Sequence, residues 1–231
     1  MNQLADAPGG ASMTPTLPRR LLDTFLSPGK MVDAVVREPK WLAALLVSMA
    51  LFAISTALIP PELMAEVQRR AALARGITPP PVTERTLQLI RWFSIAGGAL
   101  SIAVIAFIMS GLYTLIFAFV LGDEGRFKQY LAIFAHAMFI PALLSLPLVP
   151  LRIQTGDPQF TLSLASFMFF LEPGYLLNLF RFLDLTQLWS TVIVALGAHA
   201  IDRRRSVGSA LAIMLSITLA FALIFARFLP T

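Results

Sequence analysis

Residues 92–121 read WFSIAGGALSIAVIAFIMSGLYTLIFAFVL, thirty consecutive residues with no carboxylate and no basic side chain. An unpaired charge at the centre of a bilayer costs about 3 kcal/mol or more, so a run of this length and composition is typical of a membrane-spanning helix. A helix of this length is about 45 Å long, which exceeds the ~30 Å hydrocarbon core. It must therefore tilt, or begin in the head-group layer.

Four further apolar stretches accompany it. Together they predict five transmembrane helices, at residues 41–59, 92–121, 130–150, 185–201 and 207–226. Pro141 removes one backbone hydrogen bond from the third span and predicts a kink there. The last two spans are joined only by residues 202–206 and must form a tight hairpin. The predicted fold class is all-α: a polytopic membrane protein with five transmembrane helices and interfacial helices.

The overall composition agrees with a membrane protein. The chain is 57% hydrophobic and 13% charged, against roughly 25% charge in an average soluble domain. Its net charge of +5 suits anionic lipid head groups better than nucleic acid, because the basic residues gather at the ends of spans. The absence of cysteine excludes disulfides and thiolate metal sites.

The N-terminal region divides into a tail and two short helices. Residues 1–16 have no periodic apolar face and are predicted to form a disordered cytoplasmic tail, with the membrane domain following over residues 17–228. Residues 17–26 predict an amphipathic helix lying on the membrane. Ser27 as N-cap and Pro28 as first helical residue predict a second surface helix that Pro39 terminates.

Two longer connections lie between spans. Residues 61–75 predict an interfacial helix closed by Gly76, after which Thr83 can cap the next helix. Residues 160–171 form a twelve-residue apolar run that is too short to cross a bilayer. A surface-lying or re-entrant segment is expected there.

The distribution of lysine and arginine predicts a cytoplasmic N-terminus. Under five spans this orientation places ten basic residues in the cytoplasm and eight on the other side, a weak bias in the direction that the positive-inside rule requires. The strongest local contribution comes from the three arginines of residues 203–205.

Three patches of sequence carry a family resemblance. They are FLSP (25–28) with PKWL (39–42); GDEGRFKQ (122–129), leading to Ala135 and Pro141; and LDLTQLW (183–189) with Gly197. In their order and spacing among five spans, these patches resemble the Yip (Ypt-interacting protein) domain family of five-span membrane proteins. The resemblance covers roughly residues 17–228.

The resemblance implies a membrane domain rather than a defined chemistry. Eukaryotic members of the family are associated with Rab-type GTPases and vesicle traffic, but their Tyr-Gly and Leu-Tyr-Gly-Pro elements have no counterpart here. The short N-terminal tail and the excess of arginine, fifteen against three lysines, are more similar to prokaryotic members. That branch implies an activity not yet assigned and a location in the bacterial plasma membrane.

His136 and His199 are the titratable side chains within the predicted spans, which makes them candidates for function. A shared metal site is disfavoured because the two histidines lie at different depths, and a metal that joined them would need further ligands. The open alternatives are a proton-relay or metal role, and neutral histidines bonded to a neighbouring helix, with His199 snorkelling to the interface.

Asp184 and Trp189 form a polar and aromatic pair at the entrance of the fourth span, with Asn178 and Arg181 upstream. An Asp before a helix can act as an N-cap, and a Trp one turn inside is a typical interface anchor. The other interpretation is a ligand or partner site on the non-cytoplasmic face.

Five basic residues are predicted to lie together on the cytoplasmic face: Arg126, Lys128, Arg203, Arg204 and Arg205. They are candidates for contacts with anionic lipid, worth about 1 kcal/mol per residue. Control of topology alone would also explain them.

The sequence favours a non-enzymatic scaffold or adaptor that binds lipids or membrane-protein partners. No catalytic motif, phosphate loop or metal-ligand spacing is present, so neither an enzyme nor a cofactor is expected. Pairs of small residues four positions apart, such as Ala106 with Ser110 and Gly208 with Ala212, allow close helix packing or homo-oligomer formation. The alternative function is a transporter or channel subunit. Coupled carriers usually bury charged residues along their path and these spans bury none, so this alternative is limited to a small neutral solute.

Overall fold

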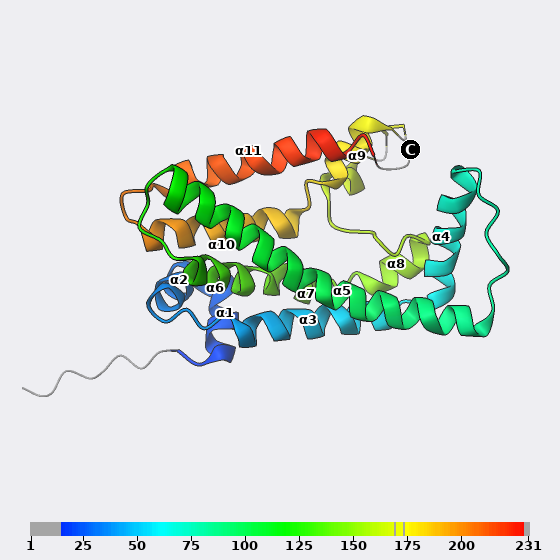
Figure 1. Ribbon diagram of the computed structural model, residues 1–231, viewed down its shortest axis with the longest axis horizontal. Helices are drawn as coiled ribbons and strands as arrows, with labels where there is room; N and C mark the ends of the chain where they lie inside the picture. The colour runs from blue at the N-terminus through cyan, green and yellow to red at the C-terminus, as the bar shows by residue number, and fades with distance from the viewer. Residues whose placement is uncertain (1–14, 169, 173, 229–231) are drawn as a thin grey trace, which may run out of the picture.

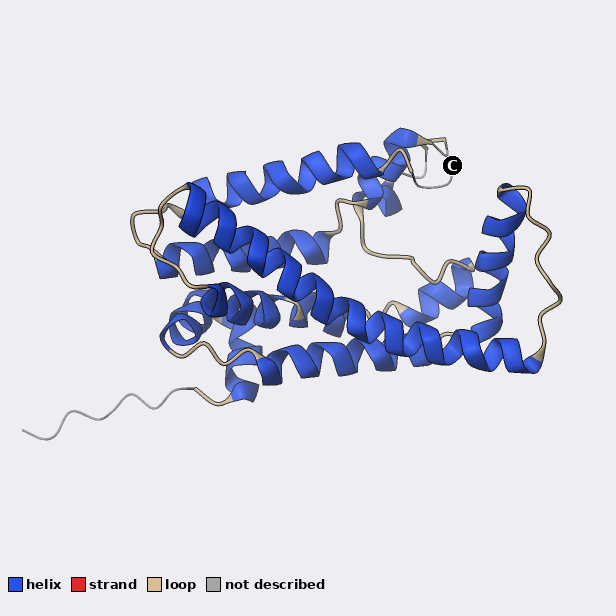
Figure 2. Cartoon of the chain, viewed as in Figure 1, coloured by secondary structure: helices blue, strands red, loops and turns tan. Residues whose placement is uncertain are grey.

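The structure is a computed structural model that describes residues 15–168, 170–172 and 174–228. Within these residues helices are joined by loops and turns (Figure 2), and one isolated bridge pairs Ser163 with Asp184. Residues 1–14 of the predicted disordered tail lie outside the described residues.

The helices follow one another in a simple order. They are α1 (Leu17–Leu26), α2 (Pro28–Arg37), α3 (Leu42–Ala57), α4 (Pro61–Ala74), α5 (Glu84–Tyr113), the π-helix η1 (Thr114–Val120), α6 (Phe127–Ala137), α7 (Phe139–Leu144), α8 (Val149–Thr155), the 3-10 turn η2 (Leu164–Phe167), α9 (Tyr175–Arg181), α10 (Leu185–Ile201) and α11 (Val207–Phe225).

Helix α6 forms the centre of the bundle. Every residue from Tyr130 to Ala137 is buried, and the helix packs against α2, α3, α5 and α10. Figure 1 shows α3, α5, α10 and α11 running along the long axis of the molecule. The exposed surfaces of α5, η1 and α11 carry large apolar side chains, such as Phe93, Phe119 and Leu219, which is the arrangement expected where lipid rather than water is the solvent.

The two ends of the bundle differ. Helices α1 and α2 lie at one end, together with the turns that join η1 to α6 and α10 to α11 (Figure 1). Helices α4, α8 and α9 lie towards the other end. Helix α4 turns away from α3 by 83°, because Pro60 and Pro61 interrupt the hydrogen bonding between them.

The prediction of five spans is not confirmed. Among the described residues, three helical segments are long and apolar enough to cross a membrane, Glu84–Val120, Phe127–Leu144 and Val207–Phe225, and the bent pair α3 and α4 would add a fourth. Helix α10 has the predicted bounds and an apolar composition, but it is only 17 residues long. Its predicted partner in the tight hairpin, α11, follows after the turn at 202–206.

The third predicted span is shorter than expected. It was predicted to run to residue 150, but α7 ends at Leu144 and a separate helix, α8, begins at Val149. Pro147 and Pro150 explain this break, since neither can donate the backbone hydrogen bond that a continuous helix requires.

Helical hydrogen bonding is also interrupted between α6 and α7, at Met138. Pro141 has no N–H to offer the carbonyl oxygen of Ala137. The hydroxyl of Ser190 in α10 lies 3.0 Å from that oxygen and also 3.0 Å from the carbonyl oxygen of Thr186 in its own helix, and its single proton is shared between the two. A side chain from a neighbouring helix is therefore in place to satisfy the carbonyl that the proline leaves free.

Several predicted helix ends agree with the structure. The Thr83 hydroxyl accepts a hydrogen bond from the backbone N–H of Thr86 at the start of α5, and Pro28 is the first residue of α2. Ser27 occupies the N-cap position of α2, but its side chain makes no capping hydrogen bond.

Helix α1 has the predicted bounds, Leu17–Leu26, and part of its polar face is buried. Its polar side chains Arg20, Asp23 and Thr24 are buried, whereas Leu22 and Leu26 are exposed. The helix packs against α2 and α6, so its polar face points partly into the protein. Residues 160–171, predicted to be surface-lying or re-entrant, contain the single 3-10 turn η2 among their described residues.

Candidate functional site

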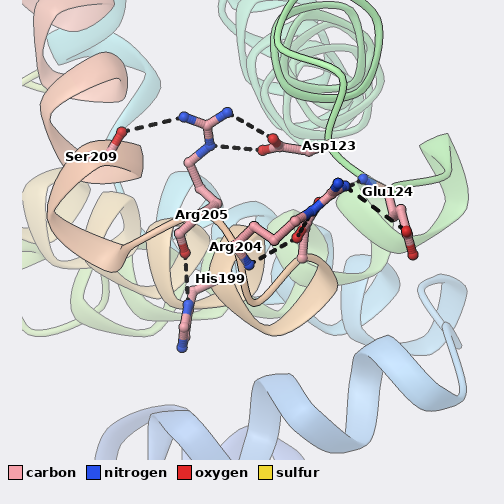
Figure 3. Close-up of polar contacts among 7 residues, drawn as sticks. Asp123, Glu124, His199, Arg204, Arg205 and Ser209 are labelled. Atoms are coloured by element: carbon pink, nitrogen blue, oxygen red, sulfur yellow. Dashed lines mark hydrogen bonds and ion pairs between the residues drawn. The ribbon is translucent and has the colours of Figure 1, made fainter.

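Two turns that are far apart in sequence meet at one end of the bundle. The Arg205 guanidinium donates to both carboxylate oxygens of Asp123, with N···O distances of 2.7 and 2.8 Å (Figure 3). Arg205 also lies 6.0 Å from the centre of the Phe117 ring. The paired side chains are only 19% and 7% exposed, so this fork-like ion pair is largely shielded from water.

Asp202, in the second turn, also joins the two turns. Its carboxylate accepts hydrogen bonds from the backbone N–H of Glu124 at 3.0 Å, from the backbone N–H of Arg204 at 2.9 Å, and from the Arg204 guanidinium at 2.7 Å. The Arg204 guanidinium and these two backbone donors hold the pKa of the Asp202 carboxyl well below its usual range.

His199 completes the arrangement. Its Nδ1 donates to the carbonyl oxygen of Arg205 at 2.7 Å (Figure 3), which ties the end of α10 to the following turn. We refer to these residues as the turn cluster: Asp123, Glu124, His199, Asp202, Arg204 and Arg205.

Helix α2 is linked to the turn cluster by a more exposed contact. Arg203 donates to Asp33 at 2.7 Å, and these side chains are 65% and 46% exposed. Gln129 of α6 donates to the backbone carbonyl of Val36 at 3.2 Å. The N-terminal helices and both turns therefore share one face of the protein.

The five basic residues predicted to contact anionic lipid are not equivalent. Arg203, Arg204 and Arg205 each form an ion pair with an aspartate within this face. Arg126 and Lys128 are exposed, and no carboxylate of the described residues forms an ion pair with either. The positive charge available to an outside partner is therefore smaller than the sequence suggested.

His136 is separate from His199 and lies in the core of α6, fully buried. Its Nδ1 is 2.7 Å from the carbonyl oxygen of Ala132, one turn earlier in the same helix, so the expected bond to a neighbouring helix is not what the structure shows. Its Nε2 has no hydrogen-bond partner within the described part of the chain, and neither do Nε and Nη1 of the buried Arg20. Across those residues no group of His, Asp or Glu could hold a metal ion.

Asp184 caps α10, accepting from the backbone N–H groups of Thr186 at 2.7 Å and Gln187 at 3.1 Å. Trp189 is exposed one turn later. Asp184 also lines a cavity together with Arg181 and Pro141. The two polar groups predicted near this span entrance, Asp184 and Arg181, thus face a common space.

Arg152 is a residue that sequence analysis did not single out. It belongs to α8, is 7% exposed, and lines the same cavity. Arg152 lies in a separate helix because the chain breaks between α7 and α8, at Pro147 and Pro150. Those two prolines are the sequence signal that residue 152 does not directly follow the end of the third span.

The small-residue pairs fall in two environments. Ala106 and Ser110 are buried inside the bundle, whereas Gly208, Ala212, Ser216 and Ala220 are all exposed along α11. The first pair serves packing within the protein. The second set leaves one side of α11 free for a neighbouring helix.

The helical bundle, its apolar outer surface and its charged ends define a multi-pass membrane protein. The Yip1 domain matches residues 22–228, and the chain belongs to the Yip1 domain family, which is generally non-catalytic. A search of curated proteins finds no match, and a search of solved structures finds none either.

Proposed function

We propose that this protein is a non-enzymatic adaptor of the prokaryotic type, located in a bacterial plasma membrane with its N-terminus in the cytoplasm. In this proposal it binds membrane-protein partners or lipid head groups at the face formed by the turn cluster and α2. The shielded ion pair between Asp123 and Arg205 is the observation that carries the proposal. It fixes two turns in one arrangement before any partner arrives, which reduces the entropy lost on binding.

Charge favours a protein partner over a purely lipid surface. Three arginines of this face are paired with aspartates, and an attraction of about 1 kcal/mol per basic residue applies only to charge that remains free. Four exposed basic residues of this face form no ion pair within the described residues, Arg126 and Lys128 with Lys30 and Arg37 of α2, and these attract anionic lipid. A surface that presents both signs of charge in fixed positions suits recognition of a second protein.

The same contacts support the five-span arrangement. The turns at 122–126 and 202–206 are joined by Asp123 and Arg205 and so belong to one side of the membrane. The chain between them must therefore cross an even number of times. Helices α6 and α7 supply one crossing, and α10, about 26 Å long at its 17 residues, is apolar enough to supply the other.

Recovery of partners from membranes tests the adaptor function. The double variant Arg126→Gln/Lys128→Gln removes two free positive charges beside the turn cluster. As a matched control, Arg75→Gln/Arg85→Gln removes two exposed basic side chains from the other end of the bundle, which likewise form no ion pair within the described residues. After cross-linking in membranes and purification in mild detergent, the first variant should recover several-fold less partner at unchanged membrane abundance. Equal recovery by both variants and the wild type would contradict the proposal.

A further inference from the structure

A cavity of about 370 Å³ lies in the half of the bundle opposite the turn cluster. Its volume is within the range of small-molecule sites in proteins, towards the lower end. Apolar side chains from α5 and α7 and the segments beside them form its walls, among them Ile102, Ile105, Met138 and Leu148. Charged side chains gather on another part of its lining, namely Arg152, Arg181 and Asp184.

Arg152 is the unusual member of this lining, because it is a buried cation with neutral partners. Its Nε donates to the carbonyl oxygen of Phe160 at 3.0 Å, and its Nη1 donates to the hydroxyl of Ser55 at 3.2 Å. Nowhere in the described residues does a carboxylate form an ion pair with it. Asp157 and Asp184 attract the Arg152 guanidinium electrostatically without forming an ion pair with it, and a buried charge that lacks a direct counter-ion is unfavourable. The cavity beside it is where an anion would relieve that cost.

The carboxylate of the lining does not already fill this role. Oδ1 of Asp184 accepts hydrogen bonds from the backbone of Thr186 and Gln187 and from the Thr186 hydroxyl, as the N-cap of α10. Arg181 is more exposed than Arg152, and its Nη1 donates to the Asn178 side chain at 3.2 Å. Two guanidinium groups and one capping carboxylate leave the lining with net positive charge.

We propose that this cavity binds a single-chain amphiphile with an anionic head group, of the fatty-acid class. The head group would lie at Arg152, with Arg181 nearby, because a carboxylate matches the paired N–H groups of a guanidinium. The hydrocarbon chain would lie against Ile102, Ile105 and Met138. A soluble anion would leave these apolar walls uncovered, and a neutral lipid would leave Arg152 unmatched. This site does not depend on the proposed adaptor face, since it lies at the other end of the bundle.

Binding measurements on the purified full chain in mild detergent test the site. The probes are palmitate, hexadecanol as the uncharged analogue, and inorganic phosphate as the anion without a chain. Palmitate should bind one per protein and at least tenfold more tightly than hexadecanol, and phosphate should not displace it. Equal binding of palmitate and hexadecanol, or displacement by phosphate, would overturn the proposal.

Variants separate the buried arginine from exposed ones. Arg152→Gln keeps a side chain that can bond to Ser55 and should weaken palmitate binding at least tenfold. Arg85→Gln, in the exposed first turn of α5, should bind palmitate as the wild type does. An Arg152→Gln protein that binds palmitate normally would overturn the proposal.

A measurement on the unaltered protein covers the case in which Arg152→Gln fails to fold. Palmitate with a diazirine on its chain should label the wild-type protein at peptides containing Ile102, Ile105 or Met138. Labelling confined to the outer surface, for example at Phe93 and Phe119, would show that the chain lies in the surrounding detergent or lipid and would equally overturn the proposal. This labelling experiment does not depend on partner recovery. Failure of the proposed lipid site is therefore distinguishable from failure of the proposed adaptor function.

Discussion

Two ion pairs at the same end of the bundle differ in how far water reaches them. The pair of Asp123 with Arg205 is shielded, forms two parallel hydrogen bonds and lies beside an aromatic ring. The pair of Asp33 with Arg203 has a similar closest distance but is largely exposed. Burial, rather than distance, should decide how much each ion pair contributes to the free energy of unfolding, because solvent screens an exposed pair.

Replacing one cation from each pair tests this difference. Arg205→Gln should lower the free energy of unfolding by about 1–3 kcal/mol, since it leaves the Asp123 carboxylate shielded without its counter-charge. Arg203→Gln should change it by about 0.5 kcal/mol or less. Reversible unfolding in detergent measures both values. Similar losses in the two variants would show that shielding is not what matters here.

The packing of α6 against α10 depends on one glycine. A Cβ atom built on Gly197 would lie 2.6 Å from two side-chain carbons of Ile133, closer than any such contact in real proteins. The two helices can therefore approach this closely only because residue 197 has no side chain. Gly208, on the exposed side of α11, has open space in the same position.

Gly197→Ala should destabilise the protein by about 1–3 kcal/mol through overpacking, and Gly208→Ala should leave stability unchanged or slightly higher, because alanine favours the helix. Ile133→Ala should make room for the added methyl group. The double variant Gly197→Ala/Ile133→Ala should then lose less stability than the two single variants combined. Thermal unfolding in detergent measures the four proteins, and strict additivity would contradict a direct clash.

Pro141 and Ser190 form a second link between helices, in which one residue compensates for the other. The proline frees the carbonyl of Ala137, and the serine hydroxyl shares its proton between that carbonyl and the one of Thr186. Ser190→Ala should cost about 1 kcal/mol, the order measured for hydrogen bonds between membrane helices.

The Pro141→Ala background tests whether the stability cost of Ser190→Ala depends on the proline. An alanine at residue 141 restores an N–H that can reach the Ala137 carbonyl, so in this background Ser190→Ala should cost less than half as much. The Pro141→Ala protein should still insert in the membrane, with altered packing of α6 and α7. A cost of Ser190→Ala that is the same in both backgrounds would show that the two residues act independently.

Local features of the helices were predictable from sequence. Thr83, Pro28 and Asp184 mark helix starts through contacts within a few residues, and α10 has the predicted bounds. Contacts between distant segments were not predictable. The partners of Arg203 and Arg205 lie 170 and 82 residues away, and no local pattern reports them.

The same limit explains the errors in the larger elements. Residues 130–150 resemble one span because their apolar composition hides the effect of Pro147, and the burial of polar side chains on α1 depends on its contacts with α2 and α6, which no local pattern reports. Arg152 was missed for this reason too. Its surroundings come from segments distant in sequence, such as α3 with the hydroxyl of Ser55, rather than from its own sequence neighbours.

For the chain as a whole, the link between the two turns predicts a topology. Reporter fusions after residues 40, 125 and 204 should report the cytoplasm, and those after residues 78 and 231 the opposite side. The signals at 125 and 204 should agree in particular, because Asp123 and Arg205 hold these turns together. Two or more reversed signals would contradict five spans with a cytoplasmic N-terminus.

The ion pairs of the turn cluster also set an order of events during synthesis. Asp33 and Asp123 leave the ribosome 170 and 82 residues before the arginines that pair with them. Until the last hairpin has been made, both carboxylates stand at the membrane surface without those counter-charges. An unfinished or truncated chain thus presents two carboxylates without the arginines that pair with them in the finished protein.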